Sequence, residues 1–183
     1  MKPGLDQKDS WQYMQEMLPL VQDLWRGDVA HKGRFWQFPS ATSCPKPLQQ
    51  TVPMWVAARS PITFDYAVAN DCHIMSWPLT LPFSEAVKYR TQLDEAIAKN
   101  GGTYAGRFAM MRHTSVYETA SDRQSALDAT RGVLSQFGNL IMKSGEVRNG
   151  FPDPVPLESL DGNFRVEPKM LEDNLMFGSP SQV

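Results

Sequence analysis

The sequence predicts an α/β fold with parallel strands, which form either a sheet or part of a β/α barrel. Short apolar stretches alternate with amphipathic helices between about residues 54 and 143. This alternation is typical of parallel strands that are joined by right-handed crossovers. The pattern opens on a helix near residue 10 and closes after one helical turn near residue 179. Because three parallel strands alone would leave open edges, we expect a fragment of a larger barrel.

Composition is that of an ordinary globular chain. Of the 183 residues, 42% are hydrophobic and 21% charged, which predicts a single domain over residues 1–183. A net charge of −2 with scattered Lys and Arg argues against a nucleic-acid partner.

No apolar run reaches membrane-spanning length and the N-terminus lacks a signal-peptide core, so we expect no membrane contact and a cytoplasmic location. Cys44 and Cys72 lack metal-ligand spacing; we expect reduced thiols and no metal site.

The first element is a helix over residues 10–26, where apolar side chains recur on one face and Pro19 is expected to introduce a kink. Residues 27–50 are rich in Pro and Gly and predict a loop region that contains a short extended pair. His31 lies in this polar region, and we expect it to be solvated.

Two strand-and-helix units follow. The first comprises a strand over residues 54–58 and a helix over 61–69. The second begins with a strand over residues 72–77. Its helix is predicted to be capped by Ser84 and to stop at Asn100, which precedes two glycines.

A third strand is predicted over residues 107–117. Ser121 and Gln124 have the spacing of a capping box, which predicts a helix from there to about residue 143.

The C-terminal region is less regular. Prolines and glycines predict an irregular insertion over about residues 145–166, and a short helix is expected over 168–176. Ser179 and Pro180 then have the pattern of a helix start.

The junction between the strand at 54–58 and its helix is the most informative local feature. Ser60 is a strong N-cap residue, Pro61 suits the first helical position, and Thr63 lies in the first turn. Free backbone N–H groups and two hydroxyls would converge there, an arrangement that can hold a phosphate. The alternative is that Ser60 only caps the helix.

Several segments together resemble the bacterial luciferase-like flavin monooxygenases, and the resemblance covers about residues 10–183. The segments are Phe35-Trp36-Gln37-Phe38, Pro45-Lys46-Pro47-Leu48-Gln49-Gln50, Pro53-Met54-Trp55-Val56-Ala57-Ala58-Arg59-Ser60-Pro61-Ile62-Thr63, Ile74-Met75-Ser76-Trp77, Val116-Tyr117-Glu118-Thr119-Ala120-Ser121 and Gly178-Ser179-Pro180-Ser181-Gln182-Val183.

The resemblance implies a partial (β/α)8 TIM-type barrel, whose N-terminal strands and last strand are missing here. Such a barrel binds reduced flavin at the carboxyl ends of its strands. The implied cofactor is FMN, with the deazaflavin F420 as the alternative. By position, Ser60 and Thr63 would hydrogen-bond the flavin phosphate, and Arg59 would supply a backbone contact or charge. The family often has an acidic residue at the position of Arg59, which leaves its role open. Ser76 and Trp77 would lie near the flavin ring or ribityl chain, with core packing as an equal alternative.

The function implied is that of a flavin-dependent monooxygenase fragment, which oxidises a small organic substrate with O2 and reduced flavin. A flavin reductase and a dimer are further expected partners. No catalytic residue is assigned, because the family's catalytic residues lie on earlier strands, so the isolated chain should be a poor catalyst. One alternative is a non-catalytic flavin- or phosphate-binding protein that needs a partner chain. Another is an unrelated barrel enzyme with a phosphate site.

Overall fold

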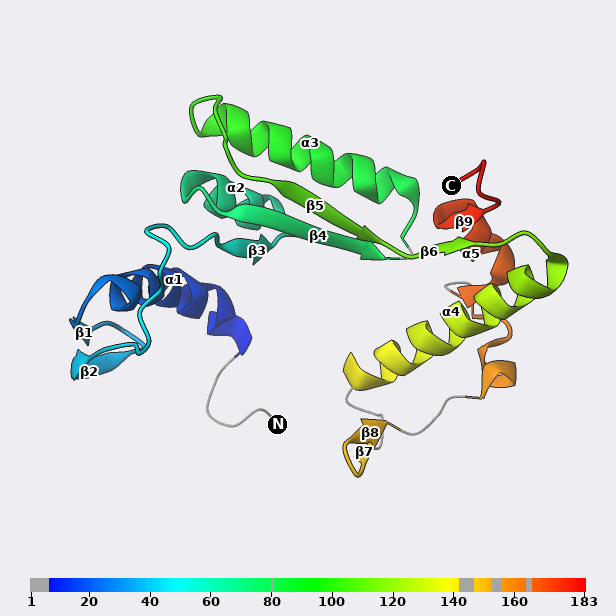
Figure 1. The fold of residues 1–183 in the computed structure, drawn as a ribbon, viewed down its shortest axis with the longest axis horizontal. Coiled ribbons are helices and arrows are strands. Elements are labelled where there is room, and N and C mark those ends of the chain that lie inside the picture. The colour runs from blue at the N-terminus through cyan, green and yellow to red at the C-terminus, as the bar shows by residue number, and fades with distance from the viewer. Residues whose placement is uncertain (1–6, 80, 142–146, 153–155, 164–165) are drawn as a thin grey trace. The chain divides into compact units, whose positions relative to one another are not determined.

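The computed structural model describes residues 7–183 apart from residue 80 and the segments 142–146, 153–155 and 164–165. Its contacts divide the chain into two compact units, Met1–Val52 and Pro53–Val183 (Figure 1). The expectation that residues 1–183 form a single domain stays a prediction.

The first unit consists of one long helix and a hairpin. A short 3-10 turn, η1 (Gln7–Asp9), leads into helix α1 (Ser10–Arg26), which has the bounds that the sequence predicts. Strands β1 (Val29–Lys32) and β2 (Gln37–Ala41) pair antiparallel, which confirms the expected extended pair.

Glu16 holds the hairpin loop to helix α1. Its carboxylate accepts hydrogen bonds from the backbone N–H groups of Arg34, Phe35 and Trp36 at 3.0–3.3 Å. It also lies 3.0 Å from His31 Nε2. The expectation of a solvated His31 is therefore wrong: its side chain is 26% exposed and is held by a half-buried carboxylate.

The second unit begins with a parallel sheet. Strand β3 (Trp55–Ala57), helix α2 (Pro61–Ala69), strand β4 (His73–Leu79), helix α3 (Phe83–Lys99) and strand β5 (Phe108–Arg112) follow one another along the chain. The strand order is β3-β4-β5 and both pairings are parallel, with Val56 opposite Ile74 and Ile74 opposite Phe108. This confirms the predicted α/β alternation; β4 runs two residues beyond its predicted end.

Helices α2 and α3 lie on one side of this sheet (Figure 1). Their core centres on Phe64, whose ring centroid lies 6.2 Å from those of Tyr89 and Phe108. Fully buried apolar side chains from α2, β4 and α3 complete it. Along β4, buried and exposed residues alternate, so Ile74 and Ser76 face the helices while Met75 and Trp77 face away.

The predicted third strand is divided at His113. Strand β5 pairs with β4, whereas β6 (Thr114–Val116) pairs in parallel with β9 (Met176–Gly178), a strand that the sequence did not predict. The division coincides with two contacts of His113: Nε2 lies 3.1 Å from Thr130 Oγ1, and the carbonyl accepts from Met176 N–H at 3.2 Å.

Two predicted helix caps are wrong. Helix α3 begins at Phe83 after Pro82, so Ser84 is its second residue and not its cap. Helix α4 (Ala120–Ile141) begins before Ser121, because the Thr119 hydroxyl accepts from the Asp122 N–H at 3.1 Å and thereby caps the first turn. The predicted end of this helix near residue 143 falls outside the described residues.

The C-terminal region is irregular as expected. It contains β7 (Val147–Arg148), β8 (Phe151–Pro152) and the 3-10 turn η2 (Leu157–Leu160). Helix α5 (Pro168–Asn174) ends two residues before its predicted end because Met176 enters β9.

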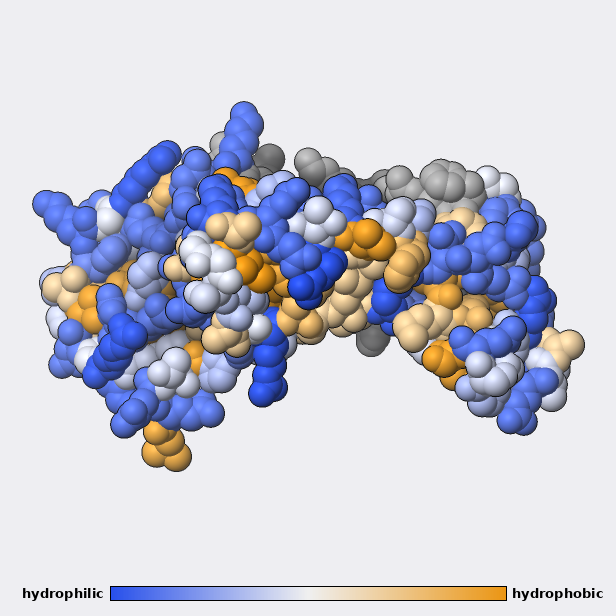
Figure 2. Space-filling view, turned by 90° about the horizontal axis from the view of Figure 1, so that it is seen from above, coloured by the Kyte–Doolittle hydropathy of each residue, from blue (hydrophilic) through white to orange (hydrophobic). Residues whose placement is uncertain are grey.

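The surface seen in Figure 2 is mainly hydrophilic, with hydrophobic side chains gathered in patches. On helix α3, Phe83 and Val87 are exposed hydrophobic residues. No helix among the described residues is long and apolar enough to cross a membrane.

Candidate functional site

The candidate phosphate site is the turn between β3 and α2, at the carboxyl end of β3. Ser60 has extended backbone angles, with φ −118° and ψ 154°, and Pro61 begins the helix. Within the first helical turn, Pro61 has no N–H, and the Thr63 N–H donates to the Ser60 carbonyl at 3.0 Å. The expected convergence of several free N–H groups is therefore not found, and the positive end of the helix dipole is what favours an anion here. The carboxyl edge of parallel strands is also where barrel enzymes place their active sites.

The Thr63 hydroxyl closes this turn from within. It accepts hydrogen bonds from the N–H groups of Arg59 and Ser60 at 3.3 and 3.2 Å and donates to the Ser60 carbonyl at 2.7 Å. Ser60 and Thr63 form a capping box, and their hydroxyl oxygens lie 3.3 Å apart. Thr63 thus fixes the shape of the turn, while the exposed Ser60 hydroxyl lies beside it at the helix end.

Ser76 ties the same turn to the neighbouring strand β4. Its side chain is fully buried, and Oγ donates to the Ala58 carbonyl at 2.8 Å. Ala58 N–H in turn donates to the Met75 carbonyl at 3.0 Å. The end of β3 is therefore tied to β4 immediately before Arg59, and the one hydroxyl proton of Ser76 is used in that contact. Direct contact of Ser76 with a flavin stays a prediction.

Trp77 lies on the opposite face of β4 from Ser76. Its side chain is 36% exposed, and Met75 on the same face is 41% exposed. In the described part of the second unit, α2 and α3 cover the other face of this sheet (Figure 1). Trp77 thus offers an aromatic surface near the carboxyl end of β4, where a ring ligand could stack.

Arg59 is exposed and directly precedes the Ser60 cap. A guanidinium at this place adds a full positive charge to the partial charge of the helix end. The turn therefore brings together a cation and a hydroxyl at the positive end of a helix, which are groups that bind a phosphate monoester. The residues present fit the phosphate of a flavin mononucleotide.

Two histidines of the second unit make hydrogen bonds within the fold. His113 is half-buried and bonded to Thr130, and His73 Nδ1 accepts from the Arg107 N–H at 3.0 Å. Both cysteines are free thiols, and burial raises the pKa of Cys72. Among the described residues, no cluster of His, Cys, Asp or Glu could hold a metal ion.

Arg112 is a residue that the sequence analysis missed. It lies at the carboxyl end of β5 and donates through Nη1 to the Leu81 carbonyl at 2.8 Å and through Nη2 to the Asn174 carbonyl. Burial lowers the pKa of this guanidinium. The available signal was an arginine inside an otherwise apolar strand pattern.

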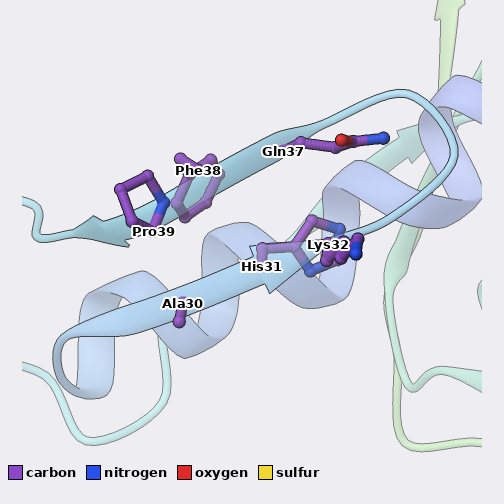
Figure 3. Close-up of a pocket in the computed structure, with 6 residues that line it drawn as sticks. All are labelled: Ala30, His31, Lys32, Gln37, Phe38 and Pro39. Carbon is purple, nitrogen blue, oxygen red and sulfur yellow. The ribbon is translucent and has the colours of Figure 1, made fainter.

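The first unit contains a separate open cavity of about 480 Å³ on the β1–β2 hairpin. Figure 3 shows its lining: Ala30, His31 and Lys32 from β1, and Gln37, Phe38 and Pro39 from β2. His31 belongs to the Glu16 contact described above, so the hairpin is braced at the edge of this cavity.

Comparisons with known proteins are consistent with this geometry. The sequence matches the Luciferase-like monooxygenase family over residues 2–183. It is 33% identical, over all of its length, to the flavin-dependent trigonelline monooxygenase, oxygenase component, of Acinetobacter baylyi (strain ATCC 33305 / BD413 / ADP1), and covers 51% of that protein. The chain thus spans about half the length of the curated relative that it matches.

Two solved structures share the fold. Monooxygenase RslO1 from Streptomyces bottropensis matches with a TM-score of 0.58 and 22% identity, over 72% of this chain and 43% of that one. An F420-dependent secondary alcohol dehydrogenase, solved with an F420-acetone adduct, matches with a TM-score of 0.54 and 20% identity, over 88% and 50%. These likenesses confirm the predicted α/β fold as part of a luciferase-like TIM-type barrel. With the family match over nearly its whole length, the chain belongs to the luciferase-like monooxygenase family.

Proposed function

We propose that this chain carries the cofactor-phosphate site of a flavin-dependent monooxygenase, and that the β3–α2 turn is that site. The observation that carries the proposal is the braced turn, in which Thr63 and Ser76 fix the backbone while Ser60 and Arg59 are exposed. Ser60 Oγ would donate to a phosphate oxygen, and Arg59 would supply charge. A direct bond from Thr63 would require its hydroxyl to leave the cap.

The proposed cofactor is FMN. Family membership and the flavin-dependent relative support a flavin-type cofactor, and the F420-dependent structural neighbour keeps the deazaflavin as the alternative. Trp77 would lie against the ring system or the ribityl chain, because it faces away from the helices near the carboxyl end of β4. Met75, on the same face, would help to keep water from the ring.

The proposed reaction is the oxygenation of a small organic substrate in the cytoplasm. Reduced flavin, when bound, supplies the electrons with which O2 is activated. The residues of this chain would anchor the cofactor and exclude water from it. Because the Acinetobacter relative is named as an oxygenase component, we propose that a separate reductase supplies the reduced flavin.

The Ser60→Ala variant tests the site. Removing a hydrogen bond to a charged phosphate should weaken FMN binding by about 1 to 3 kcal/mol, or roughly 5- to 150-fold in Kd. Titration of the purified protein with FMN, followed by quenching of flavin fluorescence, measures this change.

Ser84→Ala is the matched control, since Ser84 is an exposed serine in the first turn of α3. The control should bind FMN with the wild-type Kd. An unchanged Kd in Ser60→Ala, with both variants folded by circular dichroism, would remove Ser60 from the site.

A further inference from the structure

The last residue of β4 has a strained backbone. Leu79 has φ 41°, in the left-handed region that side chains other than glycine rarely adopt. Close by, the Leu81 N–H donates to the Pro78 carbonyl at 2.6 Å. Such strain persists only where surrounding contacts hold the backbone in place.

Arg112 supplies those contacts. Its backbone lies opposite Leu79 in the β4–β5 ladder, and its Nη1 donates to the Leu81 carbonyl at 2.8 Å. Its Nη2 donates to the Asn174 carbonyl at the end of α5. Arg112 therefore joins three segments: its backbone pairs with the end of β4, and its guanidinium contacts Leu81 before α3 and the last residue of α5.

The two hydrogen bonds of the Arg112 guanidinium form a clamp at the end of β4, the strand that also carries residues of the proposed cofactor site. Trp77 precedes Leu79 by two residues on β4, and Ser76, on the same strand, bonds to the β3–α2 turn. Arg112 itself faces backbone carbonyls and is half-buried, so it acts on the site through the end of β4.

We infer that Arg112 is a positioning residue, which holds Leu79 and Leu81 in place so that the Trp77 face of β4 is preorganised for the flavin ring. This inference rests on the proposed function for its ligand, and on the clamp alone for its structural part. Because the clamp acts at the ring end, its loss should weaken FMN and riboflavin binding alike. Loss of Ser60, at the phosphate end, should weaken FMN binding only.

Three variants test the inference in the purified protein. Arg112→Gln removes the charge and the forked donors, Arg112→Lys keeps the charge with a single donor point, and Arg107→Gln is the matched control. Arg107 is an exposed arginine that directly precedes the first residue of β5, whereas Arg112 is the last residue of that strand. Hydrogen exchange of the Leu81 amide reports the clamp directly, and titration with FMN and with riboflavin reports the site.

In Arg112→Gln, the Leu81 amide should exchange about tenfold faster or more. Local opening at Leu81 would then no longer have to break the hydrogen bonds of the Arg112 guanidinium. Both flavins should bind roughly tenfold more weakly, with Arg112→Lys intermediate and Arg107→Gln like wild type. If Arg112→Gln does not fold, Arg112→Lys is compared with the control in the same way.

Unchanged exchange at Leu81 would overturn the clamp. Faster exchange with unchanged riboflavin affinity would overturn the positioning role. If the wild-type protein binds neither flavin, the proposed function fails and the flavin role of Arg112 with it, while the exchange result still decides whether Arg112 holds Leu81 in place.

Discussion

Single side chains decide what the β3–α2 turn offers to a ligand. Ser60 and Thr63 carry the same functional group three residues apart, but the Thr63 hydroxyl makes three hydrogen bonds within the turn. Ser60 is the exposed hydroxyl of the pair. Two residues that look alike in the sequence therefore differ in the structure: Thr63 shapes the turn, and Ser60 is the residue that we propose meets an anion.

Tyr104 gives a pH-dependent prediction. Its hydroxyl donates to the Cys72 carbonyl at 2.5 Å, and burial, followed by the nearby charges of Cys72 and Asp71, raises the pKa of Tyr104 to about 12. Because this folded-state pKa exceeds the ordinary value of about 10, the stabilisation is fully present below about pH 10 and is lost as the pH rises toward 12.

Tyr104→Phe should cost about 1 kcal/mol of unfolding free energy at pH 8, since one hydrogen bond is removed. Its stability should then fall less than that of the wild type between about pH 10 and 12. Urea unfolding at three pH values measures both effects. Parallel curves for the two proteins across that range would show that the phenol does not titrate as the structure implies.

At the residue scale, the sequence identified Ser60 and Thr63 as neighbours at a helix start, because capping chemistry is local. It did not identify the Ser76 contact with Ala58 or the Arg112 clamp. Both contacts join residues that are 18 or more positions apart, and such pairings depend on tertiary packing.

Among the elements, the hairpin of the first unit depends on one carboxylate. Burial raises the pKa of Glu16, but hydrogen bonds from His31 and from the N–H groups of Trp36, Phe35 and Arg34 outweigh it, so that the pKa lies below its ordinary value. Gly33 also lies against this carboxylate: a Cβ there would come within 1.9 Å of Glu16 Oε1. The hairpin loop is thus shaped around the Glu16 side chain.

Glu16→Gln should lower the thermal unfolding midpoint at pH 7, because the charge-assisted bonds to the loop are weakened. With a lowered folded-state pKa, the contribution of Glu16 is present above the ordinary value of 4.5 and is lost as the pH falls below it. The difference between wild type and variant should therefore shrink between about pH 6 and 3. Calorimetry over this range, with Glu95→Gln on α3 as the exposed control, checks the prediction. A difference independent of pH would contradict it.

Element order and type were predictable because α1 and α3 have a clear apolar face, and because α2 starts at a Ser-Pro capping pattern after a short apolar strand. Strand β9 and the division at His113 were not. A three-residue strand such as Met176–Gly178 carries too little periodicity to be recognised, and its pairing with β6 depends on contacts of more than 60 residues' separation.

For the whole molecule, the likeness to solved structures confirms the predicted barrel class. In the described sheet of β3, β4 and β5, helices α2 and α3 cover one face and not the other (Figure 1). Trp55, Met75, Trp77 and Met111 are exposed hydrophobic residues of its three strands. The sequence predicted parallel strands, but it could not show how the chain divides into units, since that depends on which contacts form between distant segments.

The division into two units gives a further prediction. Residues 42–54 contain no helix or strand, and Leu48 is fully exposed. Brief digestion with chymotrypsin should therefore cut first after Leu48, because exposed segments without regular structure fit a protease best. Mass spectrometry should show residues 1–48 and 49–183 as the first products. First cleavage within α2 or α3 would contradict the division.

The most direct test of the central claim compares FMN with riboflavin, which differs from it only in lacking the phosphate. If the β3–α2 turn holds the phosphate, the purified protein should bind FMN roughly 10- to 100-fold more tightly than riboflavin, or about 1.4 to 2.7 kcal/mol. Most of this difference should disappear in a Ser60→Ala, Arg59→Ala double variant. Equal Kd values for the two flavins in the wild-type protein would show that the turn does not bind the phosphate.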